Sequence, residues 1–517
     1  MSRALEVDQG HSQPLEAVQL HKQCELRAAL FVAVYPTMLD LGHTHAISSR
    51  KGLKMEMNEL HSSIASYLPD RYLITFSPAM PIFCKEDMQS RGFSDIKQIS
   101  YFFHEWMHYL HNVSTVHGTS SFSSLVETWS AFRWTTDGQG MSSGRIDHNT
   151  PELFRVSELM SLMEAARTNG RNNLPKGTHP DNVEVCGYSH NEAKIEGGAS
   201  QLLLSVLYSN TLGDKNKLEV VFGPGEILES VAYALEKRFL NRLAQKEPDA
   251  VEVIPYHLLT VFARHIAPSM NEEDALLCAL TSLQCTDPVS FLVKLLSKCE
   301  AIDGADGARA KHIRKSAIDQ IQHAEEVVPQ WLMRMEQMFP KNEPMALAVK
   351  EAVAYMRGNL ATRAAHPFFE IYIIEEMYAK GAEGFGDLMN DLMKKHGMCS
   401  GKQESFGFPD DVQKDILFDF AVVGKDQDLT TGRRIMQASF DFVLRHFASE
   451  GGFLPTSDAR RRPCPFYTSC DLQPRISLPD NCKSQPWMAV QSNPDALCWY
   501  AEGVLKLKPG AAANIAQ

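Results

Sequence analysis

A histidine pair spaced four residues apart is the feature that most constrains how this chain folds. His104 and His108 enclose Glu105 in the order H-E-x-x-H. Residues four apart lie on the same face of an α-helix, so both imidazoles can reach a single ion. Glu105 lies beside that face, where its carboxylate can take a proton from a water molecule held by the ion. The motif therefore predicts a helix that carries two metal ligands and a base.

The sequence around the motif favours a helix. Ser94 or Asp95 can cap its N-terminus. Large apolar side chains recur at helical spacing and predict a buried stripe, formed by Ile96, Ile99, Phe103, Met107 and Leu110. Unpaired imidazoles are costly to bury among such groups. This context favours a zinc site over a chance match among the 19 histidines of the chain.

Composition is typical of a globular protein. The chain has 517 residues, of which 44% are hydrophobic and 22% charged, and its net charge is −12. This charge argues against a nucleic-acid-binding surface and against an anionic membrane surface. No secretory signal and no bilayer-length apolar run is visible, so we expect a cytoplasmic protein. The 11 cysteines are scattered, and we expect most of them to be buried thiols.

Periodicity and composition divide the chain into four regions. Residues 1–70 form an N-terminal segment, helical or irregular, and residues 71–223 contain the motif. Residues 224–450 are overwhelmingly helical in pattern, and residues 451–517 are richer in Pro and Cys. The fold class predicted is mainly α, with some β structure (α+β). Helices are expected near residues 122–132, 151–168, 190–208, 225–245, 271–283, 287–298, 308–325, 343–358, 366–379 and 430–448.

A catalytic zinc ion normally takes three protein ligands, so a third must come from outside the histidine pair. The pattern H-E-x-x-H-x-x-G-x-x-H supplies a third histidine after a glycine turn. This chain has His111 in place of that glycine and Ser114 in place of that histidine, which disfavours the pattern. A glutamate from a second helix is the remaining option.

Two glutamates compete for this role. Glu127 follows His108 at the spacing H-E-x-x-H-x18-E, but it falls nearly opposite the apolar stripe of its predicted helix, where a solvated side chain belongs. Glu192 and Glu196 fall on the inner face of the helix predicted over 190–208, where a carboxylate needs a metal or another partner. We therefore favour Glu196 and keep Glu127 as the alternative. An ion pair between these glutamates and a basic residue is the competing interpretation.

The run Glu196-Gly197-Gly198-Ala199 resembles the E-G-x-A signature that follows the glutamate ligand in many gluzincins. Together with the H-E-x-x-H motif, residues 70–210 thus resemble zinc metallopeptidases of the gluzincin group. The resemblance implies a zincin-like core with a small sheet, one catalytic Zn²⁺ and a peptide or protein substrate. It also implies His104, His108 and Glu196 as ligands and Glu105 as general base.

Other residues receive roles from the same resemblance. Glu192 is expected to orient a ligand histidine without binding the metal itself, and Tyr188 or His190 to stabilise an oxyanion. The segment Arg71–Ser77, RYLITFS, is the clearest strand candidate. In peptidases of this type an edge strand beside the motif helix commonly pairs with extended substrate, and this strand can do so or be an ordinary sheet strand.

Three alternatives stay open from the sequence. The enzyme can be a metal-dependent hydrolase of a non-peptide amide, or the chain can be a helical scaffold protein whose motif is inactive or holds a structural metal. Near the C-terminus, Cys464, Cys470 and Cys482, with Cys498 further on, can form a second metal site. Their spacing lacks the close Cys-x-x-Cys pairs typical of structural zinc, so buried thiols are favoured there.

Overall fold

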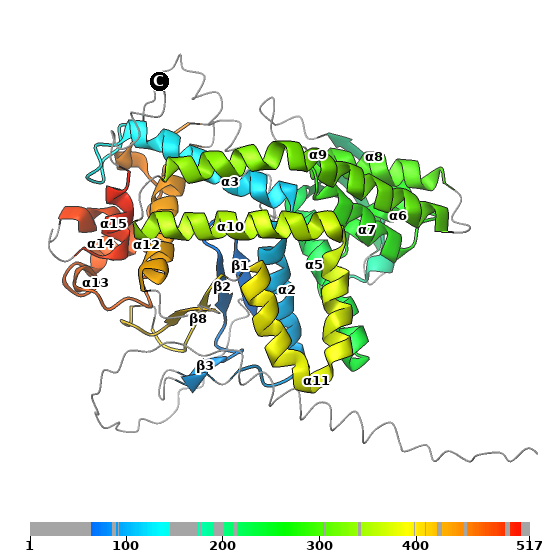
Figure 1. The fold of residues 1–517 in the computed structure, drawn as a ribbon, viewed down its shortest axis with the longest axis horizontal. Coiled ribbons are helices and arrows are strands. Elements are labelled where there is room, and N and C mark those ends of the chain that lie inside the picture. Colours follow the sequence, from blue (N-terminus) through cyan, green and yellow to red (C-terminus); the bar gives the residue numbers. More distant parts are fainter. Residues whose placement is uncertain are drawn as a thin grey trace, which may run out of the picture.

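The computed structural model describes residues 64–84, 89–90, 92–144, 174–175, 177–190, 201–209, 215–302, 307–339, 343–397, 399–408, 410–420, 427–448, 452–491 and 497–507. Helices account for 60% of these residues and strands for 12%. This confirms the mainly α class with small sheets (Figure 1). The helix predicted over 151–168 and most of the N-terminal segment lie outside the described residues.

The motif forms part of helix α2 (Ile96–Ser114), as the sequence predicts. Asp95 is its N-cap, because the Asp95 carboxylate accepts hydrogen bonds from the backbone N–H groups of Lys97 and Gln98, both at 2.9 Å. The predicted stripe is buried, with Phe103 and Met107 almost without exposed surface. Burial of this stripe fixes the rotation of α2 about its axis, and with it the direction of the two histidines.

Helix α2 ends because Thr115 takes up an extended backbone conformation, with φ −111° and ψ 157°. The Thr115 hydroxyl then accepts a 3.0 Å hydrogen bond from the N–H of Gly118 and caps the next helix, α3 (Val116–Phe132). Gly118 is required here, because a Cβ at this position would lie 2.4 Å from the backbone oxygen of Asn112. The chain therefore turns sharply between two buried helices.

Helices make up most of the described chain after residue 224 (Figure 1). They include the seven predicted after residue 224 and an additional one, α6, and their bounds are α5 (Pro224–Ala244), α6 (Leu258–Ile266), α7 (Glu272–Ser282), α8 (Pro288–Glu300), α9 (Ala308–Met338), α10 (Pro344–Ala365), α11 (Phe369–His396) and α12 (Gln427–Arg445). Helix α11 is kinked at Gly381, whose φ of 67° is not helical.

A four-stranded sheet lies beside α2 and has the order β1-β2-β8-β9. Its strands are β1 (Ala65–Leu68), β2 (Leu73–Phe76), β8 (Ser400–Gln403) and β9 (Ile416–Asp419). Neighbours pair antiparallel, except that β2 and β8 are parallel. The strand predicted at 71–77 is confirmed as β2, but its suggested edge position is wrong. Among the described strands, β1 and β9 form the two edges of this sheet, and β2 is paired on both sides.

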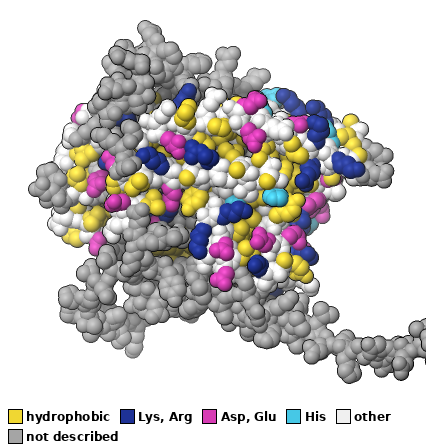
Figure 2. Space-filling model, in the orientation of Figure 1, with side chains coloured by type: hydrophobic (Ala, Val, Ile, Leu, Met, Phe, Trp, Pro, Cys, Tyr) yellow, Lys and Arg dark blue, Asp and Glu magenta, His cyan; other side chains and the backbone are white. Residues whose placement is uncertain are grey.

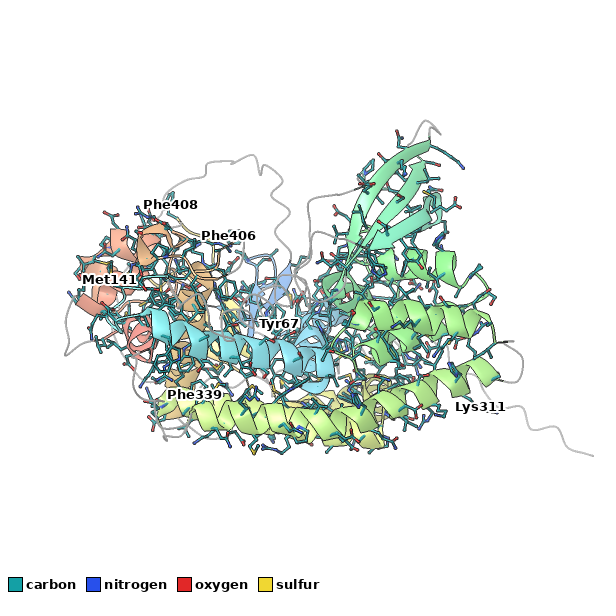
Figure 3. The ribbon with its side chains drawn as sticks, turned by 90° about the horizontal axis from the view of Figure 1, so that it is seen from above. Tyr67, Met141, Lys311, Phe339, Phe406 and Phe408 are labelled. Atoms are coloured by element: carbon teal, nitrogen blue, oxygen red, sulfur yellow. The ribbon has the colours of Figure 1, made fainter. Side chains whose placement is uncertain are left out.

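The helix predicted over 190–208 is wrong where the structure describes it. Strands β5 (Val183–His190), β6 (Leu202–Ser209) and β7 (Lys215–Phe222) form an antiparallel sheet beside α6 (Figure 3). In β6 the buried residues Leu202, Leu204 and Val206 alternate with partly exposed ones. Alternation with a period of two is the pattern of a half-buried strand, and it overrides the helical spacing of apolar residues that predicted a helix here.

The C-terminal region packs on α12 through short elements: α13 (Gln473–Ser477), α14 (Pro479–Ser484) and α15 (Trp499–Leu505). Asp441 of α12 is fully buried and is paired with Arg445 of the same helix at 2.6 Å. The Tyr500 hydroxyl also donates to Asp441, at 2.9 Å. These contacts join the end of the chain to its helical body. The remaining short hairpin pairs β3 (Phe83–Cys84) with β4 (Gln89–Ser90).

A buried polar network holds the C-terminal half of α2. The Arg363 guanidinium of α10 donates to the Ser114 backbone oxygen at 2.7 Å and forms an ion pair with Glu370 of α11 at 2.6 Å. His111 Nε2 lies 3.3 Å from the same carboxylate. Burial favours a raised pKa for Glu370, but the Arg363 and His111 side chains outweigh it and lower the pKa to about 2.

The surface of the molecule mixes charges of both signs. On the face seen in Figure 2, Lys and Arg side chains are interspersed with Asp and Glu. Across the described part of the chain, no helix combines the length and the apolar character needed to cross a membrane. The expected absence of nucleic-acid and membrane partners stays a prediction.

Buried neutral histidines predict that acid destabilises the fold. Burial lowers the pKa of His446 to about 4, and its Nδ1–H donates to the Phe442 backbone oxygen at 2.7 Å. In the unfolded chain His446 binds a proton with a pKa near 6.5, whereas in the folded chain it does so only near pH 4. The free energy of unfolding therefore falls as pH falls from about 6.5 to about 4. In urea unfolding from pH 7.5 to 5, wild type should lose about 2 kcal/mol more than His446→Gln. Equal losses in both proteins would contradict this assignment.

Candidate metal centre

Three side chains from α2 and α5 converge on one point. His104 Nε2 and His108 Nε2 lie 3.2 Å apart. One carboxylate oxygen of Glu229 lies 3.4 Å from the His104 nitrogen and 3.3 Å from that of His108. Among the described residues, this is the only set of three or more such groups whose ligand atoms all lie within 4.8 Å of one another.

These distances fit a tetrahedral metal site. Zinc binds histidine nitrogen and carboxylate oxygen at roughly 2.0–2.2 Å, which places neighbouring ligand atoms of a tetrahedron about 3.3–3.6 Å apart. The three separations in the cluster are 3.2, 3.3 and 3.4 Å. Two imidazoles and one carboxylate are also the donor set of zinc sites that keep a fourth position for water. The residues present therefore fit a zinc ion.

Packing between α2 and α5 brings Glu229 to the histidines. The rings of Phe103 and Phe239 stack between these helices with centroids 4.6 Å apart. Glu236 follows Glu229 by seven residues and so lies two turns further along nearly the same face of α5. One helix face thus delivers a candidate ligand and, two turns away, a second carboxylate.

Glu236 fixes the orientation of His104. Its carboxylate is buried, accepts a hydrogen bond from the Ser100 hydroxyl at 2.9 Å and lies 3.1 Å from His104 Nδ1. A carboxylate can only accept at this distance, so Nδ1 carries the proton and the Nε2 lone pair faces the cluster. This is the usual arrangement in which a second carboxylate orients a histidine that binds a metal.

His108 is held by strand β1. Its ring is stacked with that of Tyr67, with centroids 6.5 Å apart and planes 5° apart. Tyr67 lies on β1, and its hydroxyl accepts a 3.0 Å hydrogen bond from Asn112 of α2. The sheet edge and the motif helix are therefore joined at the candidate site.

Glu105 lies at the same junction and is partly buried. Burial raises the pKa of its carboxyl, and Glu229 adds to this effect. The opposing influences are His104, His108 and a backbone hydrogen bond from Tyr67. A carboxylate with a raised pKa beside a metal site is suited to accept and return a proton.

The electrostatics of the cluster call for a cation. Burial favours a raised pKa for Glu229, but His108 and His104 outweigh it and hold the pKa well below its usual range. Burial favours a lowered pKa for His104, but Glu229 and Glu236 outweigh it and raise the pKa well above 6.5. With Glu105 included, three carboxylates surround two imidazoles. Without an ion, protonation of the imidazoles balances the negative charge of the carboxylates. A bound divalent ion can supply this positive charge instead.

Tyr256 completes the surroundings of the cluster. It lies in the connection between α5 and α6, and its ring centroid is 5.9 Å from that of His104. Burial raises the pKa of its hydroxyl, and Glu229 and Glu105 raise it further. The hydroxyl is therefore protonated at neutral pH and can donate a hydrogen bond near the metal position.

None of the glutamates that the sequence analysis considered as third ligand is seen in the cluster. Glu192 and Glu196 lie outside the described residues, and Glu229 takes the third position of the cluster. Glu127 is not part of the cluster. It lies on α3, 3.2 Å from Arg334 of α9, and its side chain is only 10% exposed rather than solvated as expected.

The other predicted residues also differ in position. Tyr188 lies on β5 and is 40% exposed, and its ring contacts are with Phe262 and His265 of α6. His190 ends the same strand and is paired with Leu202 of β6. The described contacts of these two residues lie in the three-stranded sheet. The ring of Tyr256, by contrast, contacts that of His104.

Sequence reasoning missed Glu229, although its helix was predicted. A local signal exists, because Glu229 and Glu236 lie seven residues apart in an otherwise apolar face of PGEILESVAYALEKRFL. Two carboxylates in line on a face that must be buried require partners. Nothing in the sequence says that these partners lie more than a hundred residues upstream.

The chain was compared with known proteins at three levels. No family model, no curated protein and no solved structure gives a significant match. The function must therefore be argued from the site itself.

The geometry predicts that metal binding depends on Glu229 and not on Glu127. Wild-type protein purified with zinc should hold one equivalent of zinc at this site, and Glu229→Gln should lose most of it because one of three ligands becomes neutral. Glu127→Gln is the matched control and should keep the metal. Elemental analysis and competition with a chelator measure both. Loss of this zinc in Glu127→Gln, with retention in Glu229→Gln, would reverse the assignment.

Proposed function

We propose that this chain is a zinc-dependent peptidase. The observation that carries the proposal is the position of Glu105, a partly buried carboxylate of raised pKa beside a cluster of two histidines and a glutamate. A purely structural ion has no use for a base next to its ligands. His104, His108 and Glu229 would hold the ion.

Zinc bound at these residues would polarise a carbonyl and lower the pKa of a coordinated water. Glu105 would take a proton from the attacking water and return it to the departing amine. The Tyr256 hydroxyl donates a hydrogen bond to the oxygen that becomes negative during the attack. Glu236 keeps the imidazole of His104 aimed at the ion through both steps.

Accessibility supports an open coordination position. The side chains of His104 and His108 are 8% and 10% exposed, whereas that of Glu229 is 26% exposed. Solvent therefore reaches the cluster from the side of Glu229. A structural zinc site is usually closed by four protein ligands, whereas three ligands with access for water are typical of catalysis.

The edge strand β1 favours a peptide as the substrate. Its Ile64 end is bonded to β2, because the Ile64 carbonyl accepts from the N–H of Ser77 at 2.9 Å. In an antiparallel pair, the backbone N–H and C=O groups of successive residues point alternately toward and away from the neighbouring strand. Those of Ser66 therefore point toward β2, and those of Ala65 and Tyr67 point away from it. A backbone hydrogen bond joins Tyr67 to Glu105, which agrees with backbone groups of Tyr67 that point away from β2. An extended peptide can pair with such an edge and pass beside the base.

Loss of the base should separate catalysis from metal binding. Glu105→Gln keeps the size of the side chain but cannot accept a proton, so kcat should fall by at least about 100-fold. Zinc content should stay at the wild-type level. The measurement is cleavage of a mixed library of fluorogenic peptides by zinc-loaded protein, with mass spectrometry of the products. Wild-type turnover by Glu105→Gln would refute the peptidase assignment, as would failure of loaded wild type to cleave any library member.

Tyr256→Phe tests the role of the hydroxyl. Removing one donor to the developing oxyanion should lower kcat by roughly 100- to 1000-fold and leave KM and zinc content almost unchanged. Tyr233→Phe is the matched control, because Tyr233 is buried and its ring lies 5.7 Å from that of Tyr256. Equal kcat values for the two variants would remove Tyr256 from the mechanism.

A further inference from the structure

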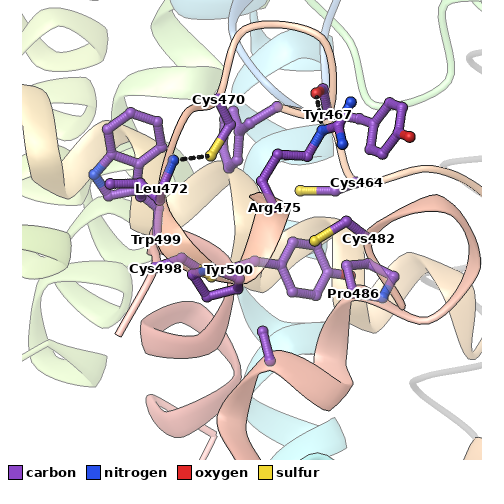
Figure 4. A pocket seen from close by; sticks show the side chains of 13 residues that line it. Cys464, Tyr467, Cys470, Leu472, Arg475, Cys482, Pro486, Cys498, Trp499 and Tyr500 are labelled. Carbon is purple, nitrogen blue, oxygen red and sulfur yellow. Dashed lines mark hydrogen bonds between the residues drawn. The ribbon is translucent and has the colours of Figure 1, made fainter. Parts of the chain in front are cut away.

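Four cysteines of the C-terminal region gather around one small cavity. Its volume is about 20 Å³, and its lining includes Cys464, Cys470, Cys482 and Cys498 (Figure 4). Three of these side chains are buried and Cys464 is partly buried. All four are free thiols. The four residues are spread over residues 464–498, and the folded C-terminal region brings them to one cavity.

The thiols are close enough to influence one another. Burial raises the pKa of Cys482 to about 11, and Cys498 and Cys470 contribute to the rise. Burial also raises the pKa of Cys464, with contributions from Cys482 and Cys498. In addition, the backbone N–H of Cys464 donates to the carbonyl of Cys482 at 2.8 Å, which ties together the segments that carry them.

Backbone donors point at the sulfurs. The N–H of Leu472 donates to Cys470 Sγ at 3.4 Å, and that of Ala501 donates to Cys498 Sγ at 3.5 Å. Cys464 Sγ accepts from the backbone of Phe466. Donors of this kind stabilise a thiolate more than a thiol, because the negative sulfur is the better acceptor. The local backbone is thus arranged for sulfur that carries charge.

A buried cation lies at the same cavity. Arg475 lines it and is only 4% exposed. Its described hydrogen bonds go to the backbone carbonyls of Tyr467 and Asp410, both at 2.8 Å, and its guanidinium lies 3.7 Å from the centre of the Tyr467 ring, but none of these groups carries a net charge. The Asp410 carboxylate is itself paired with Lys483 at 3.0 Å. A zinc ion with four thiolates has a charge of about −2 and would balance a buried guanidinium.

From this arrangement we infer a second, structural metal site, in which Cys464, Cys470, Cys482 and Cys498 bind one zinc ion. Within the described part of the chain, only the His104 cluster already has its ligand atoms within 4.8 Å, so the four thiols must close on the ion by rotation about their χ1 bonds. The cavity, at about 20 Å³, has room for one ion or water molecule and not for an iron–sulfur cluster. Binding releases the thiol protons to solvent and leaves four zinc–sulfur bonds.

Zinc stoichiometry tests this site independently of the proposed peptidase centre. Wild-type protein should hold two equivalents of zinc, and the double variant Cys470→Ser/Cys482→Ser should hold one. His104→Ala/Glu229→Gln should also hold one, and Cys299→Ser, a buried cysteine of α8 outside the cavity, should hold two. The cysteine site can also bind zinc when the His104 cluster does not. In that case wild type holds one equivalent of zinc, and of the variants only Cys470→Ser/Cys482→Ser loses it.

X-ray absorption at the zinc edge keeps the test independent of variant folding. In wild type, part of the zinc should show sulfur neighbours at about 2.3 Å. In His104→Ala/Glu229→Gln, the remaining zinc should show four sulfur neighbours and no histidine signal. Zinc without sulfur neighbours in wild type would overturn the inference. Stoichiometric iron with acid-labile sulfide would overturn the choice of zinc.

Discussion

The buried ion pair between Arg363 and Glu370 is the constraint on which the position of the motif helix depends. Both side chains are fully buried, and together they engage His111 and Ser114 of α2. Removing one partner of such a pair leaves an unpaired charge in the interior, at a cost of roughly 3–5 kcal/mol. Helices α10 and α11 are therefore bound to the C-terminal end of α2.

The same network explains why the chain departs from the pattern with a third histidine. His111 and Ser114 occupy the positions that would carry the glycine turn and that histidine, and here both are engaged with α10 and α11. The helix continues through these positions to Ser114. Because α2 does not turn back on itself, the third member of the cluster comes from a different helix, α5.

Features that depend on nearby residues were predictable from the sequence. His104, Glu105 and His108 needed only the helical period and the cap at Asp95, and the long helices after residue 224 needed only their apolar stripes. Glu229 was not predictable, because its partners are set by the packing of Phe103 on Phe239 rather than by spacing along the chain. Strand β6 was misread because its leucines satisfied both a helical stripe and an alternating strand.

The sheet beside the candidate site also affects the order in which the protein can be completed. Phe76 of β2 pairs with Gln403 of β8, 327 residues further along the chain. Contacts of such separation form late, because a long loop must close first. During synthesis, β2 therefore cannot pair with β8 until long after the two histidines and Glu229 have been made. A nascent chain can thus contain all three members of the cluster before the sheet edge beside them is supported, and that edge is completed only when most of the protein exists.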